Sequence, residues 1–334
     1  MPSPSIEVPN TCHLSRREWL HTASTAAAGA MAMHTASCEA LAQATRAEND
    51  GAIDAHVHVW TPDTDRYPLA DGFRRDDMKP PSFTPEELFE HAKPCGVARI
   101  VLIQMSFYGF DNSYMLDTMR RFPGTFSGVA VIDDSAADPP IEMRRLAKQG
   151  VRGFRIYPGK RPVDRWLAAE GLQAMWRCGA EENLAMCHLV NPDALPIIDQ
   201  NCEKFPDTPV VIDHMARIGA DGTVRTADVA ALCRLARHRQ TYVKISAFYA
   251  LGAKTPPYLD LVPLIRRLID AFGVERLMWA TDCPYQVQPG HTYSGSIELV
   301  RDRLGGLGED DRRWLLRKTA ERVFFAADVR SKNK

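Results

Sequence analysis

The sequence Asp54-Ala55-His56-Val57-His58-Val59-Trp60 ends the first apolar run of this chain that has the composition of a β-strand. Side chains alternate between the two faces of a strand, so His56 and His58 lie on the same face. Two imidazoles in this arrangement can bind one divalent metal ion. A lone histidine on a strand is more often a buried structural residue, but this pair predicts a metal site at the strand end.

This stretch belongs to the first of eight apolar, β-rich runs that alternate with longer amphipathic segments. Most of the runs are nearly continuous in Val, Ile, Leu, Met and Ala, as expected for parallel strands that are covered on both faces. The predicted strands are residues 52–60, 98–105, 126–132, 151–157, 184–190, 209–214, 241–247 and 277–281.

Helices are expected in the amphipathic segments, at residues 85–95, 113–122, 140–149, 165–180, 194–205, 227–238, 259–272 and 308–325. Pro85 and Pro140 suit a first helical turn, while Gly96, Gly150 and Gly273 suit the point where a helix ends. Eight β-then-α units in about 280 residues predict an α/β fold, the closed (β/α)8 TIM barrel. An open doubly wound sheet is the alternative, but no Gly-x-Gly-x-x-Gly follows the first strand and no P-loop is present.

Three other predicted strands end in residues that suit the same site. The fifth ends at Met186-Cys187-His188, the sixth at Ile212-Asp213-His214, and the eighth runs into Thr281-Asp282-Cys283-Pro284. Reactive groups of a (β/α)8 barrel lie at the C-terminal ends of its strands. We therefore expect His188, His214 and Asp282 to share one rim of the barrel with the two histidines of the first strand.

The composition excludes several classes of function. The chain has 334 residues, of which 45% are hydrophobic and 25% charged, and this is typical of a soluble globular protein. A formal net charge of -1 gives no electrostatic basis for binding nucleic acid or an anionic membrane. We expect a small-molecule substrate and no nucleic-acid partner. No linker divides residues 46–334, so one domain is predicted there, and a homo-oligomer stays open.

The first 45 residues differ from the rest in composition. Ser15-Arg16-Arg17-Glu18-Trp19-Leu20 precedes a weakly apolar run of Ala, Thr, Ser and Met, and Ala40-Leu41-Ala42 precedes Gln43. This pattern is typical of a twin-arginine export signal with a small-residue cleavage site, and it is too short and polar to span a membrane. A disordered Ala-rich tail is the alternative. We expect residues 1–45 to be a leader and the mature chain to work in the periplasm or outside the cell, without membrane insertion.

The cysteines do not form a metal-binding or redox motif. Two of the eight lie in the leader, and no Cys-x-x-Cys pair occurs among the others. Buried free thiols are expected, although an oxidising destination would permit a disulfide.

His56-x-His58, His188, His214 and Asp282 together resemble the residue set of the amidohydrolase superfamily. The closest likeness is to the amidohydrolase-related group that includes sugar-acid lactonases and 2-pyrone-4,6-dicarboxylate lactonase. Its blocks for strands 4, 6, 7 and 8 resemble Gly150-Val-Arg-Gly-Phe-Arg155, Pro209-Val-Val-Ile-Asp-His214, Tyr242-Val-Lys-Ile-Ser246 and Trp279-Ala-Thr-Asp-Cys-Pro284. The resemblance extends from Ala52 to Phe325. It implies an amidohydrolase-type barrel, with metal ligands His56, His58, His188 and Asp282 and catalytic residues Asp282, His188 and His214.

The fourth strand departs from the pattern of many binuclear amidohydrolases. These use a lysine there, often carboxylated, to bridge two metals, whereas this chain has Arg155 and Tyr157. Arginine stays protonated and cannot bind a cation. The expected cofactor is therefore one divalent ion, zinc with manganese as an alternative, or no metal at all, with the histidines contacting the substrate directly.

Three residues are predicted to bind the substrate. The guanidinium of Arg155 suits a bidentate pair with a substrate carboxylate, although it could instead pair with a structural acid. Arg217, which follows the sixth strand, could act in the same way, and Tyr157 could line the pocket.

Other polar residues near the strand ends are expected to have structural roles. Tyr285 and His291 lie on predicted loops of the same rim and could line the pocket, although such residues more often only pack. Lys244 is expected in a buried ion pair. Gln104 could donate a hydrogen bond to the substrate, but a polar barrel residue is expected.

The combined set predicts a hydrolase that opens a small carboxylated or sugar-derived lactone. A bound divalent ion would polarise the scissile carbonyl and lower the pKa of a water molecule toward about 7. Asp282 would take the proton of that water and return it to the leaving oxygen. His188 would complete the metal shell or hydrogen-bond the carbonyl, and His214 would polarise or orient. No Gly-x-Ser-x-Gly motif favours a serine nucleophile.

A metal-dependent non-oxidative decarboxylase is the alternative function, because such enzymes share the superfamily and its strand-end residues. The Pro-Val-Val-Ile-Asp-His and Val-Lys-Ile-Ser blocks favour the lactonase. A non-catalytic binding barrel would have no use for Asp282 beside the histidines. The loops set the substrate, so the sequence does not identify it.

Overall fold

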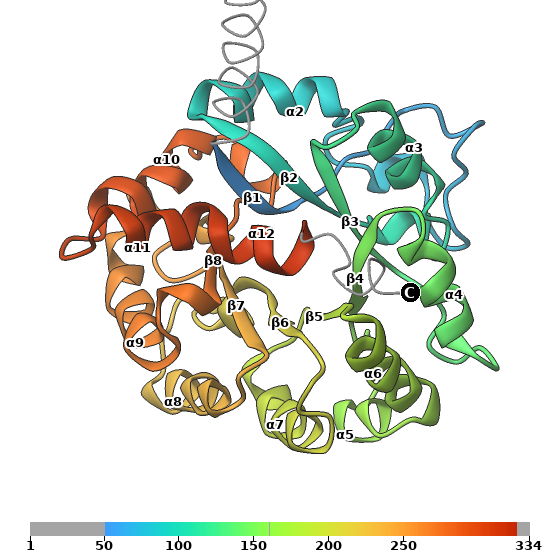
Figure 1. Cartoon of the computed structure of the whole chain (residues 1–334). Helices are drawn as coiled ribbons and strands as arrows, with labels where there is room; N and C mark the ends of the chain where they lie inside the picture. The colour runs from blue at the N-terminus through green and yellow to red at the C-terminus, as the bar shows by residue number, and fades with distance from the viewer. Residues whose placement is uncertain (1–50, 160, 326–334) are drawn as a thin grey trace, which may run out of the picture. The chain divides into compact units, whose positions relative to one another are not determined.

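The computed structural model describes residues 51–159 and 161–325, which contain an eight-stranded parallel sheet in the order β1-β2-β3-β4-β5-β6-β7-β8 (Figure 1). The strands are β1 (Ala52–Val57), β2 (Val97–Ile103), β3 (Phe126–Ala130), β4 (Val151–Ile156), β5 (Ala185–His188), β6 (Val210–Ile212), β7 (Thr241–Ile245) and β8 (Leu277–Trp279). Val57 pairs in parallel with Cys283, and the amide of Asp282 donates to the carbonyl of His56 at 2.9 Å. These contacts close the sheet, so the predicted (β/α)8 barrel is confirmed.

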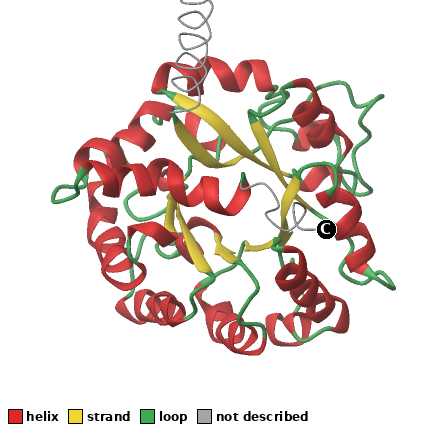
Figure 2. Ribbon diagram, in the orientation of Figure 1, coloured by secondary structure: helices red, strands yellow, loops and turns green. Residues whose placement is uncertain are grey.

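Helices surround the strands (Figure 2). They are α2 (Pro85–Ala92), α3 (Ser113–Arg121), α4 (Pro139–Ala147), α5 (Val163–Leu167), α6 (Glu170–Glu182), α7 (Leu195–Lys204), α8 (Thr226–Arg234), α9 (Val262–Phe272), α10 (Tyr293–Glu298), α11 (Glu309–Arg313) and α12 (Thr319–Phe324). α12 crosses the barrel in Figure 1, and its Ala320 and Phe324 pack against strand residues of the barrel interior such as Ile53. This helix therefore covers the barrel end at which β1 begins.

Each strand sends alternate side chains into the barrel and toward the helices. On β5, Ala185 and Cys187 pack in the small interior core, whereas Met186 packs in the larger core beneath the helices. The residue after the strand, Leu189, again lines the central cavity. The same alternation therefore directs His188, between Cys187 and Leu189, away from the barrel interior.

All eight strands end before the C-terminal limits predicted from sequence, and after β6 and β8 the chain turns sharply where the polar residues begin. β6 ends at Ile212, and His214, Met215 and Ala216 then adopt left-handed backbone angles with φ of 51°, 51° and 54°. After β8, Asp282 has φ 70°. Non-glycine residues adopt this conformation rarely, and it is often found at functional sites. His214 and Asp282 therefore lie on turns beyond the strands, whereas His56 lies within β1.

Two helical segments differ from the sequence expectation. The single helix predicted over residues 165–180 is divided into α5 and α6, which are separated at Ala168 and Ala169. α10 was not predicted, although Thr292 caps it by accepting a hydrogen bond from the amide of Gly295 at 3.0 Å. A threonine before a helical turn is a recognisable start signal. The helix is only six residues long, too short for apolar periodicity to identify it.

The predicted leader lies outside the described residues. Within residues 51–159 and 161–325, no helix combines the length and the hydropathy needed to cross a membrane. The expected free thiols are present there. Four of them are buried, at Cys178, Cys187, Cys202 and Cys283, and two are partly buried, at Cys95 and Cys233.

Candidate active site

His58 faces Asp282 with a nitrogen that carries no proton in the neutral ring. The other ring nitrogen, Nδ1, lies 2.9 Å from the carbonyl oxygen of Ile103, which can only accept a hydrogen bond, so the proton is on Nδ1. Nε2 lies 3.2 Å from Oδ1 of Asp282. An unprotonated ring nitrogen and a carboxylate oxygen are both acceptors, so this contact requires a proton or a metal cation between them.

His56, His58 and Asp282 fit a single divalent cation. Each is buried and offers one ligand atom, and these atoms lie within 4.8 Å of one another. Two imidazole nitrogens and a carboxylate oxygen form a donor set that suits zinc, and several other divalent metals bind it as well. The hydrogen bond from His58 to a backbone carbonyl is the usual support of a metal-binding histidine, because it fixes the tautomer.

A buried network of charges lies beside this group. Oδ1 of Asp213 lies 3.0 Å from Nζ of Lys244 and 3.4 Å from Nδ1 of His56, and Oδ2 lies 3.4 Å from Nη2 of Arg155. Burial alone would raise the pKa of Asp213, but the charge of Lys244, followed by the contact with His56, holds it well below its usual range. The predicted ion pair of Lys244 is confirmed, and Arg155 has the structural acid that was considered as its alternative partner.

The two oxygens of the Asp282 carboxylate have different surroundings. Oδ1 faces His58 and His56, whereas Oδ2 accepts a 2.6 Å hydrogen bond from the hydroxyl of Tyr249 and lies 3.8 Å from Nε2 of His214. Burial, followed by the charge of Asp282, raises the pKa of Tyr249 well above its usual range. Burial would also raise the pKa of Asp282, but the imidazoles of His214 and His58 hold it low. The carboxylate is therefore ionised and Tyr249 is protonated.

His214 is oriented by the strand next to it. Its Nδ1 lies 2.8 Å from the hydroxyl of Ser246, which follows β7, and its ring centroid lies 4.3 Å from that of His56. Burial lowers the pKa of His214, and the charge of Asp282 partly opposes this effect. The structure thus brings His214 to the rim that the sequence predicted for it.

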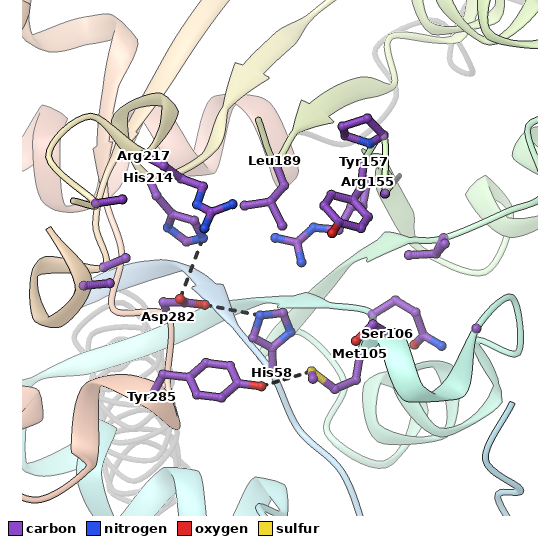
Figure 3. Close-up of a pocket in the computed structure, with 18 of the residues that line it drawn as sticks. His58, Met105, Ser106, Arg155, Tyr157, Leu189, His214, Arg217, Asp282 and Tyr285 are labelled. Atoms are coloured by element: carbon purple, nitrogen blue, oxygen red, sulfur yellow. Dashed lines mark hydrogen bonds and ion pairs between the residues drawn. The ribbon is translucent and has the colours of Figure 1, made fainter. Parts of the chain in front are cut away.

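A cavity of about 1070 Å³ opens above these residues. Figure 3 shows His58 and Asp282 on one side of it and the guanidinium groups of Arg155 and Arg217 on the other. Tyr157, which is 50% exposed, lies in the wall on the side of Arg155. The structure therefore brings the three predicted substrate-binding residues to the same cavity as the candidate metal ligands.

His188 is not part of this group. Its ring lies against the indole of Trp176 on α6, with ring centroids 5.4 Å apart, and neither ring nitrogen has a hydrogen-bond partner among the described residues. Burial lowers the pKa of His188 to about 3, so the ring is neutral. The predicted roles of His188 as metal ligand and catalytic residue stay predictions, and its present orientation does not serve them.

The remaining polar candidates pack around the cavity. The hydroxyl of Tyr285 lies 3.9 Å from the sulfur of Met105, and His291 Nδ1 lies 2.8 Å from the hydroxyl of Tyr258. Gln104 donates to the carbonyl oxygen of Asp111 at 2.5 Å, as a polar structural residue would. These contacts agree with the structural roles that were expected for Tyr285, His291 and Gln104.

Two residues of the site were missed in the sequence. Asp213 adjoins His214 in a quoted block, and a search for acids able to neutralise Lys244 would have found it. Tyr249 lies in the helical turn Phe248–Ala250, which follows a left-handed residue, Ala247, with φ 56°. Periodicity does not extend through such a turn, so the direction of Tyr249 could not be inferred from the pattern of β7.

The comparison with known proteins decides the family. Residues 53–326 match the amidohydrolase family. The chain belongs to the amidohydrolase family. This amidohydrolase is 29% identical over 244 residues to L-fucono-1,5-lactonase of Burkholderia ambifaria, covering 72% of this chain and 82% of that protein. It is 30% identical over 244 residues to 2-pyrone-4,6-dicarboxylate hydrolase of Comamonas testosteroni, covering 70% of this chain and 77% of that protein. The predicted hydrolase class is confirmed.

Solved amidohydrolase structures share the fold of this chain. A probable 2-pyrone-4,6-dicarboxylic acid hydrolase from Acinetobacter baumannii, with citric acid bound, has a TM-score of 0.68 at 21% identity and covers 83% of this chain and 100% of its own. An amidohydrolase from Burkholderia multivorans with bound zinc has a TM-score of 0.68 at 19% identity, covering 83% and 99%. At these identities the likeness concerns the fold alone.

Proposed function

We propose that this amidohydrolase opens a small carboxylated or sugar-derived lactone by attack of water on the ring carbonyl, with Asp282 as the general base. The main support for the proposal is the position of Asp282, whose carboxylate faces the cavity between His58 and His214. A carboxylate held there can take a proton from water beside a bound substrate. The lactonases among the relatives favour an ester bond in a ring as the substrate.

The arginines of the cavity wall favour a substrate with a negative charge. Within residues 51–159 and 161–325, the side chain of Arg217 makes no hydrogen bond or ion pair, and it lines the cavity. Arg155 lies on the same side of the cavity in Figure 3, and its Nη2 lies 3.4 Å from Oδ2 of Asp213. Guanidinium groups bind carboxylates in paired hydrogen bonds, so Arg155 and Arg217 together suit an anionic group of the lactone.

His56, His58 and Asp282 would hold the divalent ion, for which we propose zinc with manganese as the alternative. When bound, such an ion polarises a carbonyl and stabilises negative charge on its oxygen. The residues of the chain perform the remaining work. Oδ2 of Asp282 receives the proton of the attacking water, His214 orients the reacting groups, and Arg155 and Arg217 hold the substrate anion.

A lactone panel tests the proposal. We would incubate the zinc-loaded protein with L-fucono-1,5-lactone, 2-pyrone-4,6-dicarboxylate and uncharged analogues, and follow acid release in a pH-stat. At least one lactone should be opened, and the arginines predict at least about tenfold higher kcat/KM for a carboxylated lactone than for its uncharged analogue. Carbon dioxide release from aromatic acids, without opening of any lactone, would establish the decarboxylase instead.

A further inference from the structure

Tyr249 is the one described side chain that donates a hydroxyl hydrogen bond to the proposed general base. Its hydroxyl lies 2.6 Å from Oδ2 of Asp282, and both residues line the same cavity. The ring of Tyr249 is supported by Tyr285 and His291, whose ring centroids lie 6.4 and 6.2 Å away. These two neighbouring rings therefore restrict the positions that the hydroxyl of Tyr249 can take.

The two carboxylate oxygens of Asp282 have different neighbours, which suit them to different roles. Oδ1 is directed at His58 and His56, the candidate metal ligands, at 3.2 and 3.5 Å. Oδ2 is directed at Tyr249 and His214. Protons exchanged by the carboxylate therefore pass through Oδ2, and Tyr249 is in direct contact with that oxygen.

Lactone opening needs two proton transfers at different atoms. The attacking water must lose a proton, and the ring oxygen must gain one as it departs, since an alkoxide is a poor leaving group. A single carboxylate can serve both atoms only if it moves between them or if a second group extends its reach.

We propose that Tyr249 is a catalytic residue that donates its hydroxyl proton to the departing ring oxygen and recovers a proton from Asp282. The inference rests on the proposed lactonase function. The main observation behind the inference is the short hydrogen bond between the hydroxyl of Tyr249 and Oδ2 of Asp282 at the wall of the substrate cavity. A positioned acid of this kind typically contributes about 10²- to 10⁴-fold to a rate.

The transfers balance without any further reactant. The water oxygen forms a bond to the carbonyl carbon, and one water proton moves to Oδ2 of Asp282. When the ring carbon–oxygen bond breaks, its electron pair goes to the ring oxygen, which takes the proton of Tyr249. The proton on Asp282 then moves to the oxygen of Tyr249. The product is a hydroxy acid, and both side chains return to their starting protonation states.

The test uses Tyr249→Phe, which removes only the hydroxyl, and two lactones that the wild-type enzyme opens. The ring oxygen of one lactone departs as an alkoxide and that of the other as an enolate, which leaves readily without protonation. We expect kcat for the alkoxide lactone to fall about 10²-fold or more, and kcat for the enolate lactone to fall less than about tenfold. Circular dichroism and Tm would confirm that the variant is folded.

Tyr285→Phe is the matched control, because it removes a hydroxyl from the same wall that contacts the sulfur of Met105 rather than Asp282. It should change both rates by less than about threefold. As a measurement that needs no variant, the solvent deuterium isotope effect on wild-type kcat should be larger for the alkoxide lactone than for the enolate lactone.

Three results have distinct meanings. Equal loss of kcat for both lactones in Tyr249→Phe would overturn the inference, because a residue that only positions Asp282 affects every leaving group alike. Unchanged kcat for both lactones would overturn it as well. A folded wild-type enzyme that opens no lactone would instead refute the proposed function.

Discussion

Nη2 of Arg155 lies 3.1 Å from Nε2 of His56. This nitrogen faces Oδ1 of Asp282 at 3.5 Å, so it is the one through which His56 would bind a metal ion. One lone pair can accept a hydrogen bond from a guanidinium or bind a cation, but it cannot do both. Arg155 and the metal therefore compete for His56. When the metal occupies Nε2, Arg155 loses this partner and its guanidinium can turn toward the anion of a substrate.

The competition predicts that Arg155→Met binds zinc more tightly. Removing the guanidinium frees the lone pair of His56 and removes a positive charge beside the metal, so the Kd for zinc should fall at least about tenfold. Titration against a chelating dye measures it, without any assay of activity. Arg217→Met also removes a cavity arginine, but one with no contact to His56, and its zinc Kd should stay within about threefold of wild type. Equal zinc affinity in all three proteins would show that Arg155 does not compete.

The presence of Arg155 on β4 also predicts the metal content. Because an arginine stands where a bridging lysine would be needed, protein purified without chelators should contain at most about one divalent ion per chain by elemental analysis. Two tightly held ions per chain would contradict this interpretation of β4.

Asp282→Asn should lose turnover while keeping the fold. The amide has nearly the shape of the carboxylate but cannot accept a proton from water, so kcat should fall by about 10²-fold or more. The assay should use saturating zinc with the metal content measured, because the substitution also weakens a ligand. A folded, zinc-loaded Asn variant with turnover near that of wild type would remove Asp282 as the base.

His188→Met tests the two interpretations of His188. Its buried ring nitrogens lack partners among the described residues, and an apolar side chain of similar size removes that unfavourable burial. From the structure we expect Tm to rise by about 2 to 4 °C, with the zinc Kd unchanged within about threefold. A loss of zinc affinity of about 100-fold would instead support the ligand role inferred from the sequence resemblance.

The leader expected at residues 1–45 predicts a mature chain that begins near Gln43 and works outside the cytoplasm. N-terminal sequencing of the exported protein would locate the cleavage site. If the twin arginines form the predicted export signal, changing Arg16 and Arg17 to lysine should hold the protein in the cytosol. An exported protein that still begins at Met1, or one found only in the cytosol with or without the substitutions, would contradict the prediction.

The sequence was sufficient to predict the barrel and much of the rim. Parallel strands in a closed barrel bring their C-terminal ends together, so a residue such as Asp282 could be grouped with His56 from strand order alone. The direction of a side chain at a strand end was harder to predict. His188 and Leu189 differ by one position and point to opposite sides of β5, and only the register of the strand decides which of them faces the cavity.

The packing of α12 has a consequence for biosynthesis. Ala320 and Phe324 complete the interior core that lies beneath the charge network of Lys244, and they belong to the last helix of the described chain. The ribosome makes this helix after all eight strands. The nascent barrel therefore keeps one end open to water until α12 has been made, and the buried ion pair of Lys244 is shielded from water only then.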